Sequence, residues 1–126
     1  MKQAISTDNA ASAPAFLSQA VEANGLIFVS GQVHNLPDGS LAGESVEEKL
    51  ALIMGNIEAI LTADKRTLND IVKVTIYVTD MAQMPEINQF YPTYFVEPFP
   101  AREAVCVKEL PLGATIEVSV VAETLR

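Results

Sequence analysis

Apolar residues recur every three or four positions between residues 46 and 61 and form one stripe about four turns long. The segment Ser45-Val46-Glu47-Glu48 before this stripe fits a capping box. In that motif the Ser45 hydroxyl and the Glu48 carboxylate each accept a hydrogen bond from a free amide at the helix start. The pattern therefore predicts an amphipathic helix that begins next to Ser45.

Strict alternation of apolar and polar residues predicts a strand from Ile71 to Thr79. One face is expected to carry the apolar members, Val72, Val74, Ile76 and Val78. Residues 16–32 are expected to form two strands, because Asn24-Gly25 is a strong signal for a type I′ hairpin turn. Two closing strands are predicted at 104–107 and 116–121, joined by a turn at 111–113.

A second helix is predicted to begin near Pro85, since proline is tolerated in the first helical turn. Pro92 would remove an interior hydrogen bond, so this helix should kink or end near Tyr91. The expected order is β-β-β-α-β-α-β-β. This is an α+β class with a mixed sheet and two helices packed on one face.

The length of 126 residues predicts a single domain, 1–126, and the 49% apolar content is sufficient for a core. The polar segment 1–13 has no signal-peptide pattern, and no apolar run reaches the roughly 18 residues of a membrane span. We therefore expect a soluble cytoplasmic protein without a membrane partner.

The net charge of −8 comes from 16 acidic and 8 basic side chains. Nucleic acids are bound mainly through Lys and Arg, so RNA and DNA are disfavoured partners. One cysteine and one histidine leave no intrachain disulfide and no His/Cys metal cluster, and we expect no cofactor or metal. His34, in a loop rich in Pro, Asp and Gly, is interpreted as solvated. Cys106 is interpreted as a small core residue.

Two charged residues are candidates for chemistry. Arg102 follows Phe99-Pro100-Ala101 at the start of a strand, which is a rigid place from which to grip a carboxylate bidentately. The alternative is a surface ion pair. Glu117 lies inside an apolar strand, so it either faces solvent or has a shifted pKa, as a general base would. Ser30-Gly31-Gln32 ends a predicted strand and alone is a weak signal.

Several blocks occur in order along nearly the whole chain and together are specific. They are Ser18-Gln19-Ala20-Val21, Ile27-Phe28-Val29-Ser30-Gly31-Gln32, Asn56, Val72-Lys73-Val74-Thr75, Asn88, Tyr91, Phe95, Phe99-Pro100-Ala101-Arg102, Leu110-Pro111 and Ile116-Glu117-Val118. With these blocks the sequence resembles the RidA/YjgF family, also labelled L-PSP or "translation initiation inhibitor".

The resemblance implies a chorismate-mutase-like fold and a homotrimer with three ligand clefts between subunits. It also implies hydrolysis of reactive enamines and imines, such as 2-aminoacrylate and 2-iminopropionate, to 2-keto acids and ammonia. By the same resemblance, Arg102 pairs with the substrate carboxylate and Glu117 positions water. Ser30, Gly31 and Asn88 match cleft residues of the family.

Two positions depart from the family pattern. The family's Gly-Pro-Tyr is Ala15-Phe16-Leu17 here, so Leu17 replaces a tyrosine that contacts substrate. The family's Arg-Ser-Cys is Arg102-Glu103-Ala104, so Ala104 replaces a cleft cysteine. A more apolar cleft with a preference for bulkier 2-imino acids is expected.

Three hypotheses follow for function. The first is an enamine/imine deaminase of the 2-iminobutanoate/2-iminopropanoate type. The second is the endoribonuclease activity attached to the L-PSP label, which the net charge of −8 disfavours. The third is a regulatory trimer that binds a small ligand without catalysis, which the absence of the tyrosine makes credible.

Overall fold

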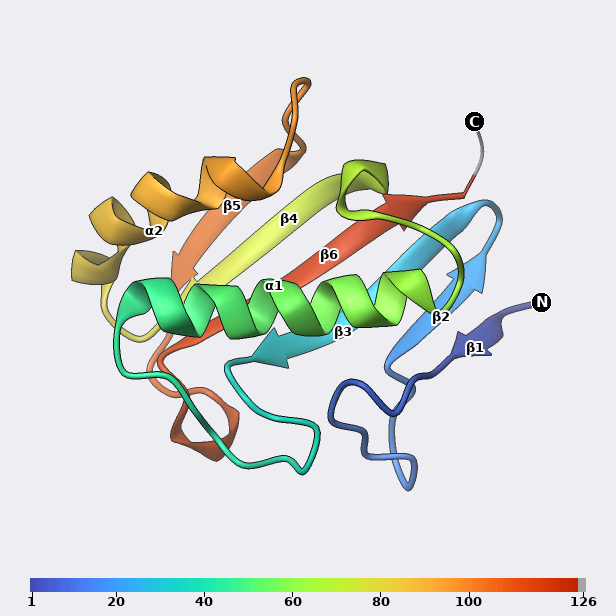
Figure 1. Cartoon of the computed structure of the whole chain (residues 1–126), viewed down its shortest axis with the longest axis horizontal. Coiled ribbons are helices and arrows are strands. Elements are labelled where there is room, and N and C mark those ends of the chain that lie inside the picture. Colours follow the sequence, from blue (N-terminus) through green and yellow to red (C-terminus); the bar gives the residue numbers. More distant parts are fainter. Residues whose placement is uncertain (125–126) are drawn as a thin grey trace.

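The computed structural model describes residues 1–124 and has one six-stranded sheet with the order β1-β2-β3-β6-β4-β5. The strands are β1 (Gln3–Ile5), β2 (Ala20–Ala23), β3 (Leu26–Val33), β4 (Ile71–Val78), β5 (Ala101–Cys106) and β6 (Ile116–Glu123). Only the β4–β5 pair is parallel. Figure 1 shows the long helix α1 (Val46–Thr62) lying across one face of the sheet, with α2 (Met84–Phe90) beside β5 on the same side. The predicted α+β class is confirmed.

The predicted capping box starts α1. The Glu48 amide donates to the Ser45 hydroxyl at 3.1 Å, and the Ser45 amide donates to the Glu48 carboxylate at 3.1 Å. The apolar stripe of α1 packs on the sheet, and its fully buried members are Leu50, Ile53, Met54, Ile57, Ile60 and Leu61. Among residues 1–124, no helix is long and apolar enough to span a membrane.

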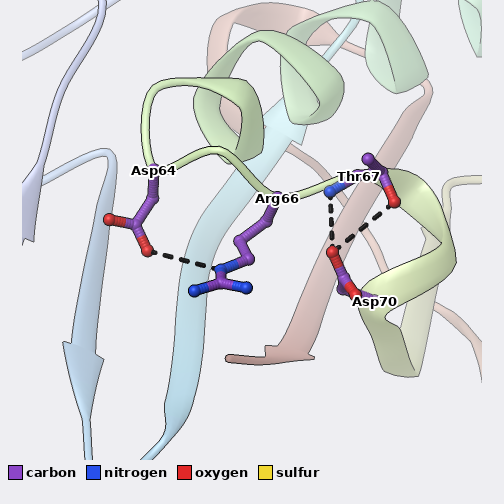
Figure 2. Close-up of polar contacts among 4 residues, drawn as sticks. All are labelled: Asp64, Arg66, Thr67 and Asp70. Carbon is purple, nitrogen blue, oxygen red and sulfur yellow. Dashed lines mark hydrogen bonds and ion pairs between the residues drawn. The ribbon is translucent and has the colours of Figure 1, made fainter. Parts of the chain in front are cut away.

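A second capping motif follows α1 and leads the chain into β4 (Figure 2). Arg66 Nε lies 4.0 Å from the Asp64 carboxylate in the connecting turn. The Thr67 amide then donates to Asp70 Oδ2 at 2.8 Å, which caps the short 3-10 helix η1 (Leu68–Asp70). The Thr67 and Asp70 contacts fix the point at which β4 enters the sheet.

The alternation predicted for β4 holds for Val74, Ile76 and Val78, which are fully buried beneath the helices. It is wrong for Val72, whose surface is 39% exposed. The pairing of β4 with β6 shifts register between Ile71 and Lys73, so that Ile71 turns inward and Val72 turns outward.

The hairpin turn is confirmed, since Asn24 and Gly25 have φ angles of 53° and 80°. The predicted strand boundaries before the turn are wrong, because β2 begins only at Ala20 and Leu17 lies in the preceding loop. The two closing strands are confirmed as β5 and β6, with the predicted turn at 111–113 between them, but they are not neighbours in the sheet. β6 inserts between β3 and β4, whereas β5 pairs only with β4.

The second helix ends as predicted. α2 stops at Phe90, and the 3-10 helix η3 (Tyr91–Tyr94) continues from it because Pro92 cannot extend the α-helical hydrogen bonding. A further 3-10 helix, η2 (Met81–Gln83), precedes α2, and η4 (Pro111–Gly113) precedes β6.

The interpretations of His34 and Cys106 are both wrong. His34 is only 4% exposed, its Nδ1 lies 2.9 Å from the Ala42 carbonyl oxygen, and the Thr115 amide donates to its Nε2 at 3.1 Å. These partners satisfy the ring without water, and desolvation by burial lowers the pKa of His34. Cys106 is exposed at the end of the edge strand β5.

Both helices lie on one side of the sheet (Figure 1), which leaves the opposite face of a single chain uncovered. Residues paired across this open face include Phe28, Val121 and Lys73 in one row. Phe28 is 44% exposed, so the face presents apolar surface to its surroundings.

Candidate active site in two halves

Arg102 lies on the helix-covered side of the sheet edge. Its Cα pairs with that of Val74, whose side chain is buried beneath the helices, so both side chains project to that side. Arg102 Nη1 donates to Asn88 Oδ1 at 2.8 Å, and its Cζ lies 4.9 Å from the ring centroid of Tyr91. Within residues 1–124 Arg102 forms no salt bridge, so the alternative of a surface ion pair is not realised in this part of the chain.

Ala104 shares the face of Arg102, because side chains two residues apart on a strand point the same way. It is half-buried and packs against the hydrophobic core. Cys106 is two residues further along on the same face and is exposed. Arg102, Ala104, Asn88 and Tyr91 are called the arginine half-site below.

Glu117 lies on β6, where its Cα pairs with those of Tyr77 and Val33. Burial raises the pKa of its carboxyl, which makes the carboxylate a stronger base than an ordinary glutamate. The side chain of Glu117 lies against Gly31 of β3. A Cβ added at Gly31 would lie 2.8 Å from Glu117 Cδ and closer still to Oε2, so a larger residue would push the carboxylate out of its present position.

A cavity of about 420 Å³ opens beside this carboxylate. Ser30 contributes a hydroxyl that donates to the Ser18 carbonyl at 2.7 Å, which leaves its oxygen free to accept a hydrogen bond. Leu17, Phe16 and Leu112 form an apolar part of the cavity wall, and Leu17 is 42% exposed. Leu17, Ser30, Gly31 and Glu117 are called the glutamate half-site below.

The two half-sites face opposite sides of the sheet. On β4, Val74 pairs with Arg102 and Tyr77 pairs with Glu117. Val74 and Tyr77 are three residues apart, and residues an odd number apart on a strand point to opposite faces. β4 also separates the two strands. The structure thus brings four predicted site residues together at Glu117 and three at Arg102. Within one chain it does not join the two sets.

Sequence reasoning missed two contributors to these half-sites. Tyr91 was named as the helix end and among the blocks that carry the family resemblance, but not as a site residue, although its spacing of three from Asn88 places both on one helix face. Leu112 was not singled out, and its positive φ of 64° in the turn before β6 gave no sequence signal. Within residues 1–124 no group of three or more His, Cys, Asp or Glu side chains could hold a metal ion.

The fold and the half-sites define a small α+β protein with one sheet, helices on one side and an arginine that has only neutral partners within the described residues. A sequence model of the family described as "Endoribonuclease L-PSP" matches residues 7–124. The chain belongs to this family, whose members include the RidA and YjgF proteins.

Two relatives carry deaminase names. The chain is 38% identical over 122 residues to Reactive Intermediate Deaminase A, chloroplastic, of Arabidopsis thaliana, covering 96% of this chain and 65% of the relative. It is 36% identical over 123 residues to 2-iminobutanoate/2-iminopropanoate deaminase of Mus musculus, covering 97% and 91%. The crystal structure of the YjgF gene product from E. coli superposes with a TM-score of 0.89 at 31% identity, covering 98% of this chain and 99% of that one.

Proposed function

We propose that this protein hydrolyses reactive enamine and imine intermediates to 2-keto acids and ammonia. The substrates would be 2-aminoacrylate, 2-iminopropionate or bulkier 2-imino acids. The names of the Arabidopsis and mouse relatives support this class of reaction. The observation that carries the proposal is the presence of two charged groups with complementary roles. Arg102 is held by neutral partners, and Glu117 is a partly buried carboxylate beside a cavity.

The chemistry needs little from the protein. An imine carbon is already electrophilic, so water can add to the C=N bond without a nucleophilic side chain. Glu117 would orient that water and accept one of its protons, and the raised pKa of its carboxyl suits a general base. The imine nitrogen takes up a proton as water adds, which gives the carbinolamine. Glu117 returns its proton to the departing nitrogen, and ammonia leaves as the carbinolamine hydroxyl loses its proton and the C=O bond forms. An enamine first takes a proton on its terminal carbon to become the imine.

Arg102 would hold the substrate carboxylate. A guanidinium offers five N–H donors in a planar fork, and within residues 1–124 Asn88 is the one hydrogen-bond acceptor seen for it. Fixing the carboxylate places the adjacent imine carbon, so the gain is one of proximity and orientation.

We further propose that the site forms between copies of the chain. Because the half-sites lie on different surfaces, each contact would join the arginine half-site of one subunit to the glutamate half-site of the next. Such head-to-tail contacts form a ring when the rotation from one subunit to the next closes. A homotrimer with three clefts fits this geometry, and it would also cover the open apolar face around Phe28.

The proposal is tested by supplying imino acids from an amino-acid oxidase and measuring keto acid and ammonia with and without the protein. Faster release with the wild-type chain, and no acceleration with Glu117→Gln, is expected. Release at the uncatalysed rate in both cases, with ligand still bound, would support the regulatory binder instead. The cavity wall formed by Leu17 is the observation that keeps this second candidate open.

The description of the matching family model raises the endoribonuclease alternative. The net charge of −8 opposes it, since phosphate binding depends on Lys and Arg. Incubation with single-stranded RNA is expected to leave the RNA intact at protein concentrations that accelerate ammonia release.

A further inference from the structure

The guanidinium of Arg102 is held at two points by one helical segment. Asn88 on α2 accepts from Nη1 at 2.8 Å, and the ring of Tyr91, three residues later, lies beneath Cζ at 4.9 Å from its centroid. Both partners are neutral. The positive charge is therefore oriented without being neutralised before a ligand arrives.

Tyr91 is a buried ring with no polar role of its own. It is 6% exposed, and its hydroxyl finds no hydrogen-bond partner among residues 1–124. Burial raises the pKa of the phenol, so the ring meets Arg102 as a neutral π face. Phe95 packs against it with ring centroids 4.9 Å apart, which fixes the orientation of the ring.

We propose that Tyr91 is a positioning residue that sets the plane of the Arg102 guanidinium for bidentate capture of a carboxylate. This inference rests on the proposed role of Arg102 in substrate binding and adds the group that orients it. A long exposed arginine samples many rotamers, and ordering it on binding weakens affinity. A cation–π contact with a fixed ring removes part of that ordering beforehand. Asn88 holds one amino group, so the remaining N–H donors of the fork are left for the ligand.

The test compares two probes, 2-oxobutanoate and its neutral amide 2-oxobutanamide, by NMR titration of the assembled protein. Tyr91→Leu is expected to weaken binding of the carboxylate about two- to fivefold, the range for a cation–π contact at an exposed site. Binding of the amide should be unchanged. Tyr91→Phe keeps the ring and should restore carboxylate affinity to within about twofold of the wild type.

Tyr94→Leu is the matched control, because Tyr94 also packs against the core from η3, whereas the cation–π contact seen for Arg102 within residues 1–124 is with Tyr91. It should leave the ratio of the two affinities unchanged. Should Tyr91→Leu not fold, Tyr91→Met, which retains bulk without a π face, carries the same expectation.

Equal losses for both probes in Tyr91→Leu would show a merely structural role and overturn the inference. Unchanged carboxylate affinity, or a wild type that does not bind 2-oxobutanoate better than the amide, would overturn it as well. The readout does not depend on turnover. If binding depends on Tyr91 while no ammonia is released, the proposed function fails and the positioning role stands.

Discussion

Arg102 and Glu117 project from opposite faces of the same sheet, and β4 lies between their strands. Their pairing partners on β4 are three residues apart, which is an odd spacing. Neither residue can serve a small ligand together with the other inside one chain. A site that uses both would therefore need a second copy of the chain to supply the other half, as proposed above.

Arg102→Lys should reduce turnover about 10- to 150-fold, the equivalent of losing one charge-assisted hydrogen bond of about 1.5–3 kcal/mol. Lysine retains the charge but not the planar fork, so two parallel hydrogen bonds become one mobile contact. The measurement is steady-state keto-acid release, with thermal melting as the control for folding. Rates near those of the wild type would remove the carboxylate clamp from the mechanism.

Leu17→Tyr should shift substrate preference, because Leu17 lines the cavity next to Glu117. A tyrosine restores a hydroxyl and refills apolar space, so activity on 2-iminopropionate should rise and activity on bulky apolar imino acids should fall. One hydrogen bond contributes about 0.5–1.5 kcal/mol net, so each shift should be several-fold. Ammonia release from both substrates is measured, and parallel changes on the two would show that Leu17 does not select the side chain.

Glu117→Gln should abolish turnover and yet stabilise the protein at neutral pH. Burial raises the folded-state pKa of Glu117 above its ordinary value of 4.5, so the folded state binds this proton more tightly than the unfolded chain. Stability is therefore lost as pH rises from 4.5 through the folded pKa. The Glu117→Gln variant has no charge to desolvate at this position. Its melting temperature should exceed that of the wild type at pH values above the folded-state pKa of Glu117 and should equal it well below pH 4. A lower melting temperature at pH 7 would contradict the desolvation of this carboxylate.

His34 should make the protein less stable as the pH falls below about 6.5. Its folded-state pKa lies below the ordinary 6.5, so the unfolded chain takes up the proton first. The contribution of neutral His34 to the free energy of unfolding is complete above pH 6.5, and it is lost as the pH falls from 6.5 through the folded-state pKa. An imidazolium could not accept the Thr115 amide hydrogen bond at Nε2.

This prediction is tested by denaturant unfolding of wild type and His34→Gln at several pH values. His34 is the single histidine of the chain, so the difference between the two proteins isolates its titration. His34→Ala should lose about 1–3 kcal/mol at pH 7, since it leaves two partly buried backbone groups, the Ala42 carbonyl and the Thr115 amide, without this partner. If the unfolding free energies of wild type and His34→Gln change in parallel between pH 5 and 7, the pH dependence does not come from His34.

Local signals predicted the elements that depend on near neighbours. The capping box at Ser45 and the turn at Asn24-Gly25 were recognisable because their partners lie within a few residues. The burial of His34 was not, because its partner Thr115 is 81 residues away. The register shift that exposes Val72 is likewise set by pairing with a distant strand.

The candidate site residues could be named from the sequence, but their placement on the sheet of one chain could not. Arg102 and Glu117 were identifiable from their strand contexts and from the family resemblance. That they occupy opposite faces is set by the registers in which β5 and β6 pair with β4, which no local pattern encodes. The cytoplasmic location stays a prediction.

The most direct test of the central claim is complementation between two inactive variants. Arg102→Met and Glu117→Gln are refolded together in equal amounts, and ammonia release is compared with that of each variant alone. Each intersubunit cleft draws its halves at random, so about one quarter of the clefts should be intact and about a quarter of wild-type activity should return. The double variant refolded with wild type reports subunit mixing, because it should likewise leave about a quarter of the clefts intact, against about half without mixing. Activity no greater than that of the separate variants, despite demonstrated mixing, would contradict a site shared between subunits.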